Sequence, residues 1–435
     1  MTSNDPASSA HISPAKPGAN ELPLSGVRIL AVEQYGAGPF GTGYLAALGA
    51  EIIKIEQPQE GGDVTRHLGP YFDPQLPDTA RSLFFQSLNL GKKSLTLNLG
   101  SPRGKSIFRS LAKTANGVVS NLRGDVPQRL GLTYAQLGPV QPAIVCGHLT
   151  GYGRDGPRAA WPGYDYLMQA EAGYFSLTGE PDSAPARMGL SMIDYMTGVV
   201  MALAVVSAIL KARDSGRGCD VDVSLYDVAL HNLNYLAAWH LNAGFAPTRQ
   251  ARSAHPSLVP CQLYRTRDGW IYLMCNKEKF WATLCDAIGH PGLADMPAFR
   301  SFKDRLEHRD ELTTILDGIL GTRDTGTWMQ AFAGRVPAAP VHTVEQALGS
   351  EFSNSGGRIS ELAAGDALLR MPRNPIRVSG TGPTGEGGAN GPGNPPRPAP
   401  ETTPAPQLGA DTRALLQEIG ISDAEQATLK ADGII

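Results

Sequence analysis

A strand, helix and strand pattern near the start of the chain is the feature that most limits its fold. Residues 27–32 are apolar enough for a buried strand, and residues 51–56 predict a second strand. Between them, Pro39 can open a helix, and Gly49 is suited to its end. Because a strand, a helix and a strand follow one another within about 30 residues, the pattern predicts a βαβ unit with parallel strands.

The same alternation continues along the first half of the chain. Further strands are predicted at residues 94–99, 117–121, 143–148 and 219–225, and helices at 102–115 and 226–241. The pattern then changes, because residues 261–266 and 270–275 flank a tight turn, which is typical of an antiparallel hairpin. Helices predicted at 280–287 and 310–320 complete a small α+β unit. The fold class is therefore α/β, a parallel sheet accompanied by a smaller α+β domain.

With 435 residues, the chain is too long for one average domain. We expect a disordered leader at residues 1–22 and the N-terminal part of a large domain at 23–225. A linker helix and a small domain should occupy 226–335, and residues 336–435 should return to the large domain. Within this last part, the Gly- and Pro-rich residues 380–406 predict an extended loop, and residues 412–429 predict a pair of terminal helices.

Charge and cysteine content exclude several classes of partner. A net charge of -3 gives no general attraction to nucleic acid or to an anionic membrane, so an anionic ligand must be held by local basic residues. Five scattered cysteines without a Cys-x-x-Cys pair favour a reducing, cytoplasmic location, and no set of residues has the spacing of metal ligands. The longest apolar run, residues 196–210, is too short to span a bilayer and predicts a buried helix.

Asp165 is the first candidate for chemistry. It follows a turn rich in glycine and proline at 151–157, and Trp161, Tyr164 and Tyr166 surround it in sequence. Partial removal of water by these neighbours would make the carboxylate a better nucleophile or base. Alternatively, the aspartate only caps a helix that starts at the next residue, although no Glu or Gln follows three residues later to complete a capping box.

Basic residues recur near the ends of the predicted strands. Arg66, Lys92 and Arg123 all occupy such places. In an open parallel sheet, the strand ends and the helix starts that follow them are where phosphate groups bind. Their repeated placement therefore favours a ligand that carries several phosphates.

A glycine pattern after the first strand offers a rival interpretation. Gly36, Gly38 and Gly41 match part of a dinucleotide-binding loop, and Glu56 ends the second strand, where a ribose contact would be expected. The same glycines could instead serve only a tight turn and close helix packing. His148 and His255 are further candidate acids or bases, but the spacing gives neither of them a partner.

Motifs along nearly the whole chain resemble one enzyme family. They are residues 24–30, Ala37-Gly-Pro39, 48–56, 62–66, 89–94, 150–157, Asp165 with Gln169 and Gly173, 216–218, Tyr226-Asp227, His255-Pro256, Asp268-Gly269, Pro340-Val341 and 405–409. Together they are similar to class III CoA-transferases, the group of formyl-CoA and carnitine CoA-transferases, with α-methylacyl-CoA racemase as a sister branch. The resemblance covers about residues 23–435.

The resemblance implies a Rossmann-like large domain, a small domain and an interlocked homodimer. It also implies that acyl-CoA and a small carboxylic acid are the substrates, with no tightly bound cofactor. Asp165 falls where the family keeps its catalytic aspartate, which forms a mixed anhydride and then an aspartyl-CoA thioester. Arg66, Lys92 and Arg123 align with positions that contact CoA in the family.

The sister branch supplies an alternative function, an acyl-CoA racemase or epimerase in which Asp165 acts as a base. Racemisation needs a proton partner on each face of the α-carbon. The branch uses a histidine as its second base, whereas this chain has Ala135 and Gln136 near that place. The formyl-CoA branch also differs, because it has a glutamine where this chain has Gly36.

Overall fold

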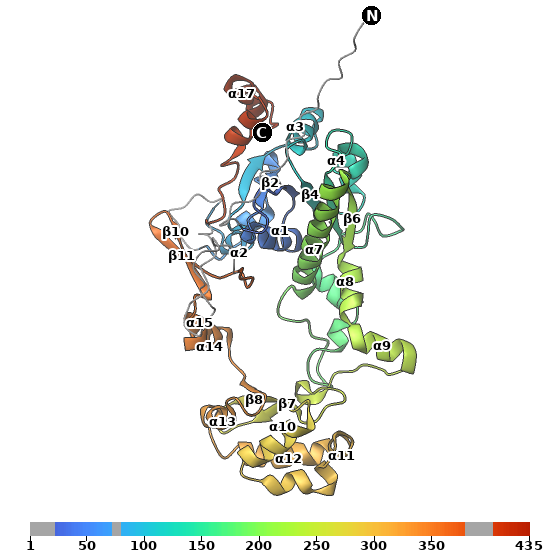
Figure 1. The fold of residues 1–435 in the computed structure, drawn as a ribbon, viewed down its shortest axis with the longest axis vertical. Helices are drawn as coiled ribbons and strands as arrows, with labels where there is room; N and C mark the ends of the chain where they lie inside the picture. Colours follow the sequence, from blue (N-terminus) through green and yellow to red (C-terminus); the bar gives the residue numbers. More distant parts are fainter. Residues whose placement is uncertain (1–21, 72–79, 379–402) are drawn as a thin grey trace, which may run out of the picture. The chain divides into compact units, whose positions relative to one another are not determined.

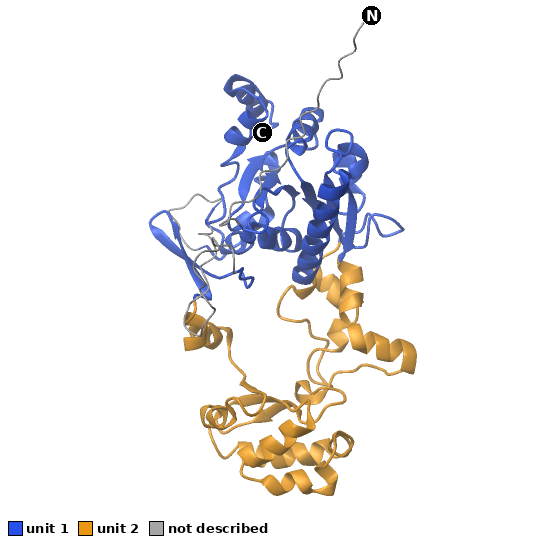
Figure 2. Ribbon diagram, viewed as in Figure 1, with its two compact units in different colours: residues 1–162, 194–224, 357–435 blue, residues 163–193, 225–356 orange. Residues whose placement is uncertain are grey.

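The computed structural model of the protein describes residues 22–71, 80–378 and 403–435. Residues 1–21 of the expected leader and most of the expected loop at 380–406 lie outside these ranges. The chain divides into two compact units (Figure 2). The large unit comprises residues 1–162, 194–224 and 357–435, and the small unit comprises 163–193 and 225–356.

This division differs from the predicted domain boundaries in two segments, and the domain assignment stays a prediction. Residues 163–193 belong to the small unit, where the Tyr174 hydroxyl donates a hydrogen bond to the carbonyl of Ala229. Residues 336–356 belong to it as well, because strand β9 (Ala338–Pro340) pairs with a strand of the small unit.

A six-stranded sheet with strand order β3-β2-β1-β4-β5-β6 forms the centre of the large unit (Figure 1). All five neighbouring pairs are parallel. The strands are β1 (Arg28–Val32), β2 (Glu51–Glu56), β3 (Lys93–Thr96), β4 (Gly117–Ser120), β5 (Val145–Thr150) and β6 (Cys219–Ser224). This is the strand order of dinucleotide-binding folds, in which the chain reverses direction across the sheet between β1 and β4. The prediction of an α/β, Rossmann-like fold is thus confirmed.

Helices cover both faces of this sheet. On one face, α3, α16 and α17 contribute Phe108, Leu415 and Leu429 to a core that includes Leu30 and Ile53 of the strands. The helices of the large unit are α1 (Ala37–Ala47), α2 (Leu83–Asn89), α3 (Pro102–Ala112), α4 (Val126–Leu130), α5 (Tyr134–Leu137), α7 (Met192–Ser215), α16 (Thr412–Glu418) and α17 (Asp423–Ala431). Short 3-10 turns at Pro58–Glu60 and Val64–His67 and a hairpin of β10 (Ile359–Ala364) and β11 (Ala367–Pro372) complete it.

Helix α7 packs with α1 and against the middle of the sheet. A side chain at Gly41 would overlap the carbonyl oxygen of Gly198, so the two helices need glycine where they cross. A Cβ atom at Gly147 of β5 would lie 2.8 Å from the Met201 sulfur and from a Val205 methyl group. The side chains of α7 therefore leave no room for a side chain at Gly147.

The expectation of a buried helix at 196–210 was only half right. By length and composition α7 could span a membrane, with a mean hydropathy of 2.0 over its apolar window, and 44% of that window is buried inside the protein. Its outer face exposes apolar side chains at Met196, Val199, Leu203 and Leu210. Because residues 196–210 are apolar on nearly every side of the helix, the sequence does not show which face of α7 contacts the sheet.

The small unit is built on a three-stranded antiparallel sheet in the order β7-β8-β9. The predicted hairpin is confirmed as β7 (Cys261–Arg265) and β8 (Trp270–Met274). The expected helix at 226–241 is divided into α8 (Leu225–Asn232) and α9 (Asn234–Ala243), and Asn234 has a positive φ of 44° at the break. The remaining helices are α6 (Asp165–Glu171), α10 (Glu278–Ala287), α11 (Phe302–Glu307), α12 (Arg309–Leu320), α13 (Thr325–Phe332), α14 (Val344–Gly349) and α15 (Glu351–Asn354), with short 3-10 turns at Tyr174–Ser176, Ala251–Ser253, Pro291–Asp295 and Pro297–Phe299.

Candidate active site

The loops that follow β1 and β4 meet at the carboxyl edge of the large unit's sheet. The Asn121 side chain holds both backbone groups of Gln34, accepting from its N–H at 2.9 Å and donating to its carbonyl at 2.6 Å. A Cβ atom at Gly38 would lie 2.9 to 3.0 Å from the Asn121 and Glu33 side chains. In other proteins, the ligands of such sheets bind at this reversal of strand order.

Arg123 follows β4 at this edge and is the exposed member of the three predicted CoA contacts. Its side chain is 46% exposed, and one guanidinium nitrogen lies 3.2 Å from Asp125. The next residue, Gly124, donates its N–H to the carbonyl of Ala159 at 2.9 Å, and a side chain there would overlap the carbonyl of Gly153. The backbone next to Arg123 is therefore fixed against the glycine-rich turn after β5.

The other two predicted CoA contacts, Arg66 and Lys92, are buried and ion-paired. Arg66 is fully buried, forms a double hydrogen bond to Glu56 at 2.7 and 2.8 Å, and stacks on the Phe85 ring 3.7 Å from its centroid. Lys92 lies 2.8 Å from a carboxylate oxygen of Glu33 and donates to the carbonyl of Pro39 at 2.9 Å. Their charges thus face carboxylates of the protein, which differs from the expected exposure to a phosphate.

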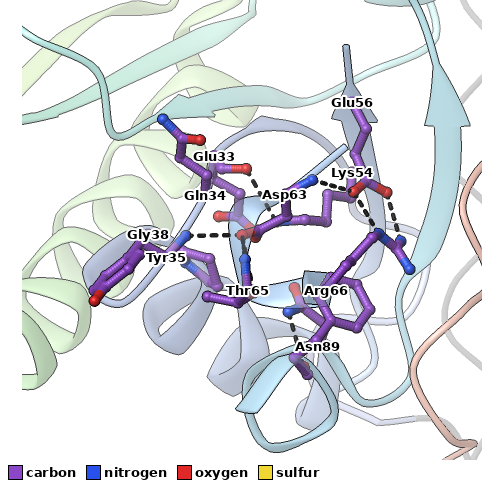
Figure 3. Close-up of polar contacts among 12 residues, drawn as sticks. Glu33, Gln34, Tyr35, Gly38, Lys54, Glu56, Asp63, Thr65, Arg66 and Asn89 are labelled. Atoms are coloured by element: carbon purple, nitrogen blue, oxygen red, sulfur yellow. Dashed lines mark hydrogen bonds and ion pairs between the residues drawn. The ribbon is translucent and has the colours of Figure 1, made fainter. Parts of the chain in front are cut away.

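These two pairs belong to a buried charge network of three acids and three bases, Glu33, Glu56, Asp63, Lys54, Arg66 and Lys92. Figure 3 shows most of it. The Lys54 ammonium lies at its centre, 2.8 Å from Asp63 and 3.0 Å from the carbonyl of Glu33. Asp63 also accepts from the N–H groups of Tyr35 at 3.2 Å and Thr65 at 2.9 Å. The network therefore fixes the loop that leads into α1.

The network determines the charge states of its members. Burial alone would lower the pKa of Lys54, but the carboxylates of Asp63, Glu33 and Glu56 outweigh it and raise that pKa. Burial alone would raise the pKa of Asp63, but the nearby ammonium group of Lys54 outweighs burial and lowers that pKa. For Lys92, burial dominates over the attraction of Glu33 and lowers the pKa to about 8. Lys54 and Asp63 are therefore an ionised pair at neutral pH.

The structure does not support the dinucleotide-binding interpretation, because the residue expected to contact the ribose is engaged in other contacts. Glu56, the expected ribose contact, is 3% exposed. Its carboxylate accepts hydrogen bonds from Arg66, from the Ser94 hydroxyl at 2.6 Å and from the N–H of Asp63 at 3.0 Å. Gly38 and Gly41 have packing partners, as described above. The glycines thus serve the turn and the helix crossing, which was the structural alternative.

Asp165 is the first residue of α6 in the small unit. Tyr164, with an extended backbone, occupies the N-cap position, so the interpretation of Asp165 as the cap was wrong. The Asp165 side chain is nearly fully buried although Tyr164, Tyr166 and Leu167 next to it are exposed. Its Oδ1 accepts a hydrogen bond from Nε2 of Gln169 at 2.5 Å. A carboxylate at a helix start is also stabilised by the helix dipole.

The contact of Gln169 with Asp165 and the partners of the buried bases were not predicted from the sequence, although Gln169 belongs to the motifs that carry the family resemblance. Gln169 follows Asp165 by four residues, and side chains at this spacing meet on a helix, so the contact had a detectable signal. The contact between Lys54 and Asp63 had no such signal in the sequence, because it depends on how the loop after β2 folds back. Asn121 likewise meets Gln34 only through strand order.

Both histidine candidates have partners that spacing could not show. His148 is fully buried, with Nε2 2.8 Å from Asp220 and Nδ1 3.2 Å from the Ser120 hydroxyl, which is itself buried. Nδ1 of His255 accepts from the N–H of Ser257 at 3.1 Å, and burial together with Arg309 lowers the pKa of this ring. Among residues 22–71, 80–378 and 403–435, no group of acids, histidines and cysteines is arranged to hold a metal.

Comparison with known proteins identifies the family. The family model for CoA-transferase family III matches residues 24–393. The chain belongs to CoA-transferase family III. It is 34% identical over 370 residues to an acetyl-CoA:oxalate CoA-transferase of Acetobacter aceti, which covers 84% of this chain and 91% of that protein. It is also 31% identical over 407 residues to a succinate–glutarate CoA-transferase of Agrobacterium fabrum, covering 91% and 96% of the two chains.

Solved structures agree with this membership in CoA-transferase family III. A CaiB/BaiF family protein from Brucella suis has a TM-score of 0.75 and 27% sequence identity, and the match covers 92% of this chain and all of that one. A crystal structure of Rv3272 from Mycobacterium tuberculosis has a TM-score of 0.76 at 28% identity, covering 91% and 99%. The protein is therefore an enzyme of the CoA-transferase class, as the motifs predicted, and its substrates are CoA thioesters.

Proposed function

We propose that this CoA-transferase moves CoA from an acyl-CoA donor to a carboxylic acid through a covalent intermediate on Asp165. The observation that carries the proposal is the buried Asp165 carboxylate at the start of α6, with one oxygen held by Gln169 at 2.5 Å. A carboxylate that has lost water and is held in one orientation is a better nucleophile than a solvated one.

Asp165 begins the reaction by attacking the thioester carbonyl carbon of the donor, and the C–S bond breaks. CoA leaves as a thiolate, and the acyl group remains on Asp165 as a mixed anhydride. The thiolate then attacks Cγ of Asp165, which releases the donor's acid and gives an aspartyl-CoA thioester. The acceptor carboxylate attacks the same Cγ and frees the thiolate, which takes the acceptor's acyl group and restores the aspartate.

Arg123 is proposed as a direct contact of CoA. It is half-exposed at the sheet edge where phosphates bind in such folds, on a backbone fixed by Gly124. Arg66 and Lys92 are proposed to support CoA binding from within the buried charge network, by fixing the loop into α1. These assignments rest on position, burial and the resemblance.

Replacing Arg123 by alanine should raise the KM for the acyl-CoA substrate about 10-fold, because one charged hydrogen bond to phosphate is lost. The kcat should change less than about 3-fold, since a contact that is equal in ground and transition state does not speed the chemical step. Steady-state kinetics with varied acyl-CoA measure both. Arg413→Ala is the control, because Arg413 is also exposed and paired with an aspartate. An unchanged KM in Arg123→Ala would remove Arg123 from the site.

We propose short dicarboxylic acids as the first acceptors to test. The relatives from Acetobacter aceti and Agrobacterium fabrum are named for oxalate, succinate and glutarate. A screen of such acids with one labelled acyl-CoA donor would identify the acceptor by the transfer of label. The racemase alternative gains no support from the residue near the place of its second base. The Gln136 side chain caps α5, where it accepts a hydrogen bond from Thr133 and donates one to the carbonyl of Gln128 at 2.9 Å.

A homodimer is also proposed, since the resemblance implies one. The outer face of α7 supports it, because Met196, Val199, Leu203 and Leu210 expose an apolar stripe that a second chain would cover. We expect Leu203→Glu to convert the protein from a dimer to a monomer of 46.1 kDa in analytical ultracentrifugation. Leu306→Glu, at an exposed leucine of α11, should leave the dimer intact. A wild-type protein that is already monomeric would contradict the proposal.

A further inference from the structure

Gln169 makes three hydrogen bonds inside the small unit, and together they fix its orientation. The side chain is fully buried. Its Oε1 accepts from the N–H of Met188 at 3.0 Å, while its Nε2 donates to the carbonyl of Leu190 at 3.1 Å and to Oδ1 of Asp165 at 2.5 Å. A backbone N–H needs an acceptor and a backbone carbonyl needs a donor, so the amide cannot be turned around. Nε2 therefore points its N–H at Asp165.

We propose that Gln169 is a catalytic residue that stabilises the negative charge formed on Oδ1 of Asp165 whenever Cγ of Asp165 is attacked. This inference rests on the proposed covalent function. In this proposal Oδ1 keeps its hydrogen bond from the amide, and Oδ2 attacks the donor and becomes the bridging atom of the anhydride. Oδ1 is then the carbonyl oxygen of the intermediate.

Two steps of the cycle place charge on this oxygen. When the CoA thiolate attacks Cγ, the C–S bond forms and the electron pair of the carbonyl moves to Oδ1. The pair returns as the bond to the bridging oxygen breaks and the donor's acid leaves. The acceptor carboxylate then attacks Cγ in the same way: the carbonyl electron pair moves to Oδ1 and returns as the C–S bond breaks and the thiolate leaves. A prearranged N–H donor at such an oxygen typically contributes about 10² to 10³ in rate.

A purely structural role for Gln169 predicts something different. Its bonds to Met188 and Leu190 hold the segment after α6, and their loss would lower stability and substrate affinity together. The loss of a donor to Oδ1 lowers, in addition, the rate of the steps at Cγ when the acyl-CoA donor is saturating. The two roles are thus separable by kinetics.

The test is the rate at which the aspartyl-CoA thioester forms when enzyme is mixed with acyl-CoA alone, followed by rapid quench and mass spectrometry of the Asp165 peptide. In Gln169→Leu we expect this rate, measured with a saturating concentration of the donor, to fall about 100-fold. Gln262→Leu is the matched control, because Gln262 is a buried glutamine of the same unit that donates to Thr313. Its rate should stay near that of the wild type.

Gln169→Glu provides a second variant that keeps the shape of the side chain. Two carboxyl groups this close share a proton, and the pKa of one of them rises strongly. The protonated form of the new group can donate to Oδ1, and the ionised form cannot. We therefore expect the rate of Gln169→Glu to recover at least about 10-fold, relative to Gln169→Leu, as the pH falls from about 8 to about 5.5.

The outcomes separate the two proposals. If the wild type forms no CoA adduct on Asp165, the covalent function fails. If the wild type forms it and Gln169→Leu does so at a rate within about 3-fold, the function stands and the role of Gln169 is refuted. A raised KM with no recovery of Gln169→Glu at low pH would also refute it, in favour of the structural role.

Discussion

Replacing Asp165 by asparagine should reduce CoA transfer by at least about 10⁴-fold, because removal of a covalent nucleophile costs this much or more in comparable enzymes. Asparagine has nearly the same size, and its amide oxygen can still accept the hydrogen bond that Gln169 donates to Oδ1. The variant should therefore fold and bind acyl-CoA as the wild type does. Steady-state assays with isothermal titration of CoA measure the two properties separately.

Asp423→Asn is a suitable control, since Asp423 is an exposed, ion-paired aspartate at the start of α17. It should retain full activity. If Asp165→Asn keeps more than a few per cent of the wild-type rate, Asp165 is not the nucleophile. If it instead loses CoA binding or stability, the carboxylate serves the fold rather than the reaction.

The second large effect is expected at Lys54, the centre of the buried charge network. Lys54→Met should lower the free energy of unfolding of the large unit by about 3 to 5 kcal/mol, because Asp63 loses its ammonium partner in a buried place. Guanidinium titration followed by tryptophan fluorescence and circular dichroism measures the loss. Agreement between the probes is needed, since a chain of two units can unfold in more than one step.

Lys93→Met is the matched control on the neighbouring strand. Lys93 pairs with Glu51, but its side chain is 42% exposed and that of Glu51 is 29% exposed. Exposed pairs contribute about 0 to 1 kcal/mol, so this substitution should change stability little. A double substitution, Lys54→Met with Asp63→Asn, should recover part of the loss because no unpaired charge remains on Asp63. Equal losses in Lys54→Met and Lys93→Met would show that the network contributes nothing.

Local patterns were sufficient to predict the sheet and the hairpin. A parallel strand buried on both faces is rich in apolar residues, as β1 is. Both β1 and β2 begin and end within a residue of the predicted limits. The break between α8 and α9 was not predicted. Asn234 adopts a left-handed conformation there, which asparagine tolerates, but the residues around it give no sequence signal of a break.

The candidate site could be predicted only in part, and the reason is physical. The chemical type of Asp165, Arg66, Lys92 and Arg123 is readable from the sequence, but their partners are set by tertiary contacts. Arg66 pairs with Glu56 ten residues earlier, and Lys92 pairs with Glu33 from another strand end. Burial by such partners changes what a basic residue can do, so position after a strand alone does not distinguish a phosphate contact from a structural ion pair.

The most direct test of the central claim is to trap the intermediate. Wild-type enzyme is mixed with an acyl-CoA donor without acceptor, quenched with hydroxylamine, and digested for mass spectrometry. We predict a hydroxamate on Asp165 that appears only with the donor present and is absent in Asp165→Asn. An enzyme that turns over a donor and an acceptor acid while its Asp165 peptide stays unmodified would contradict the account.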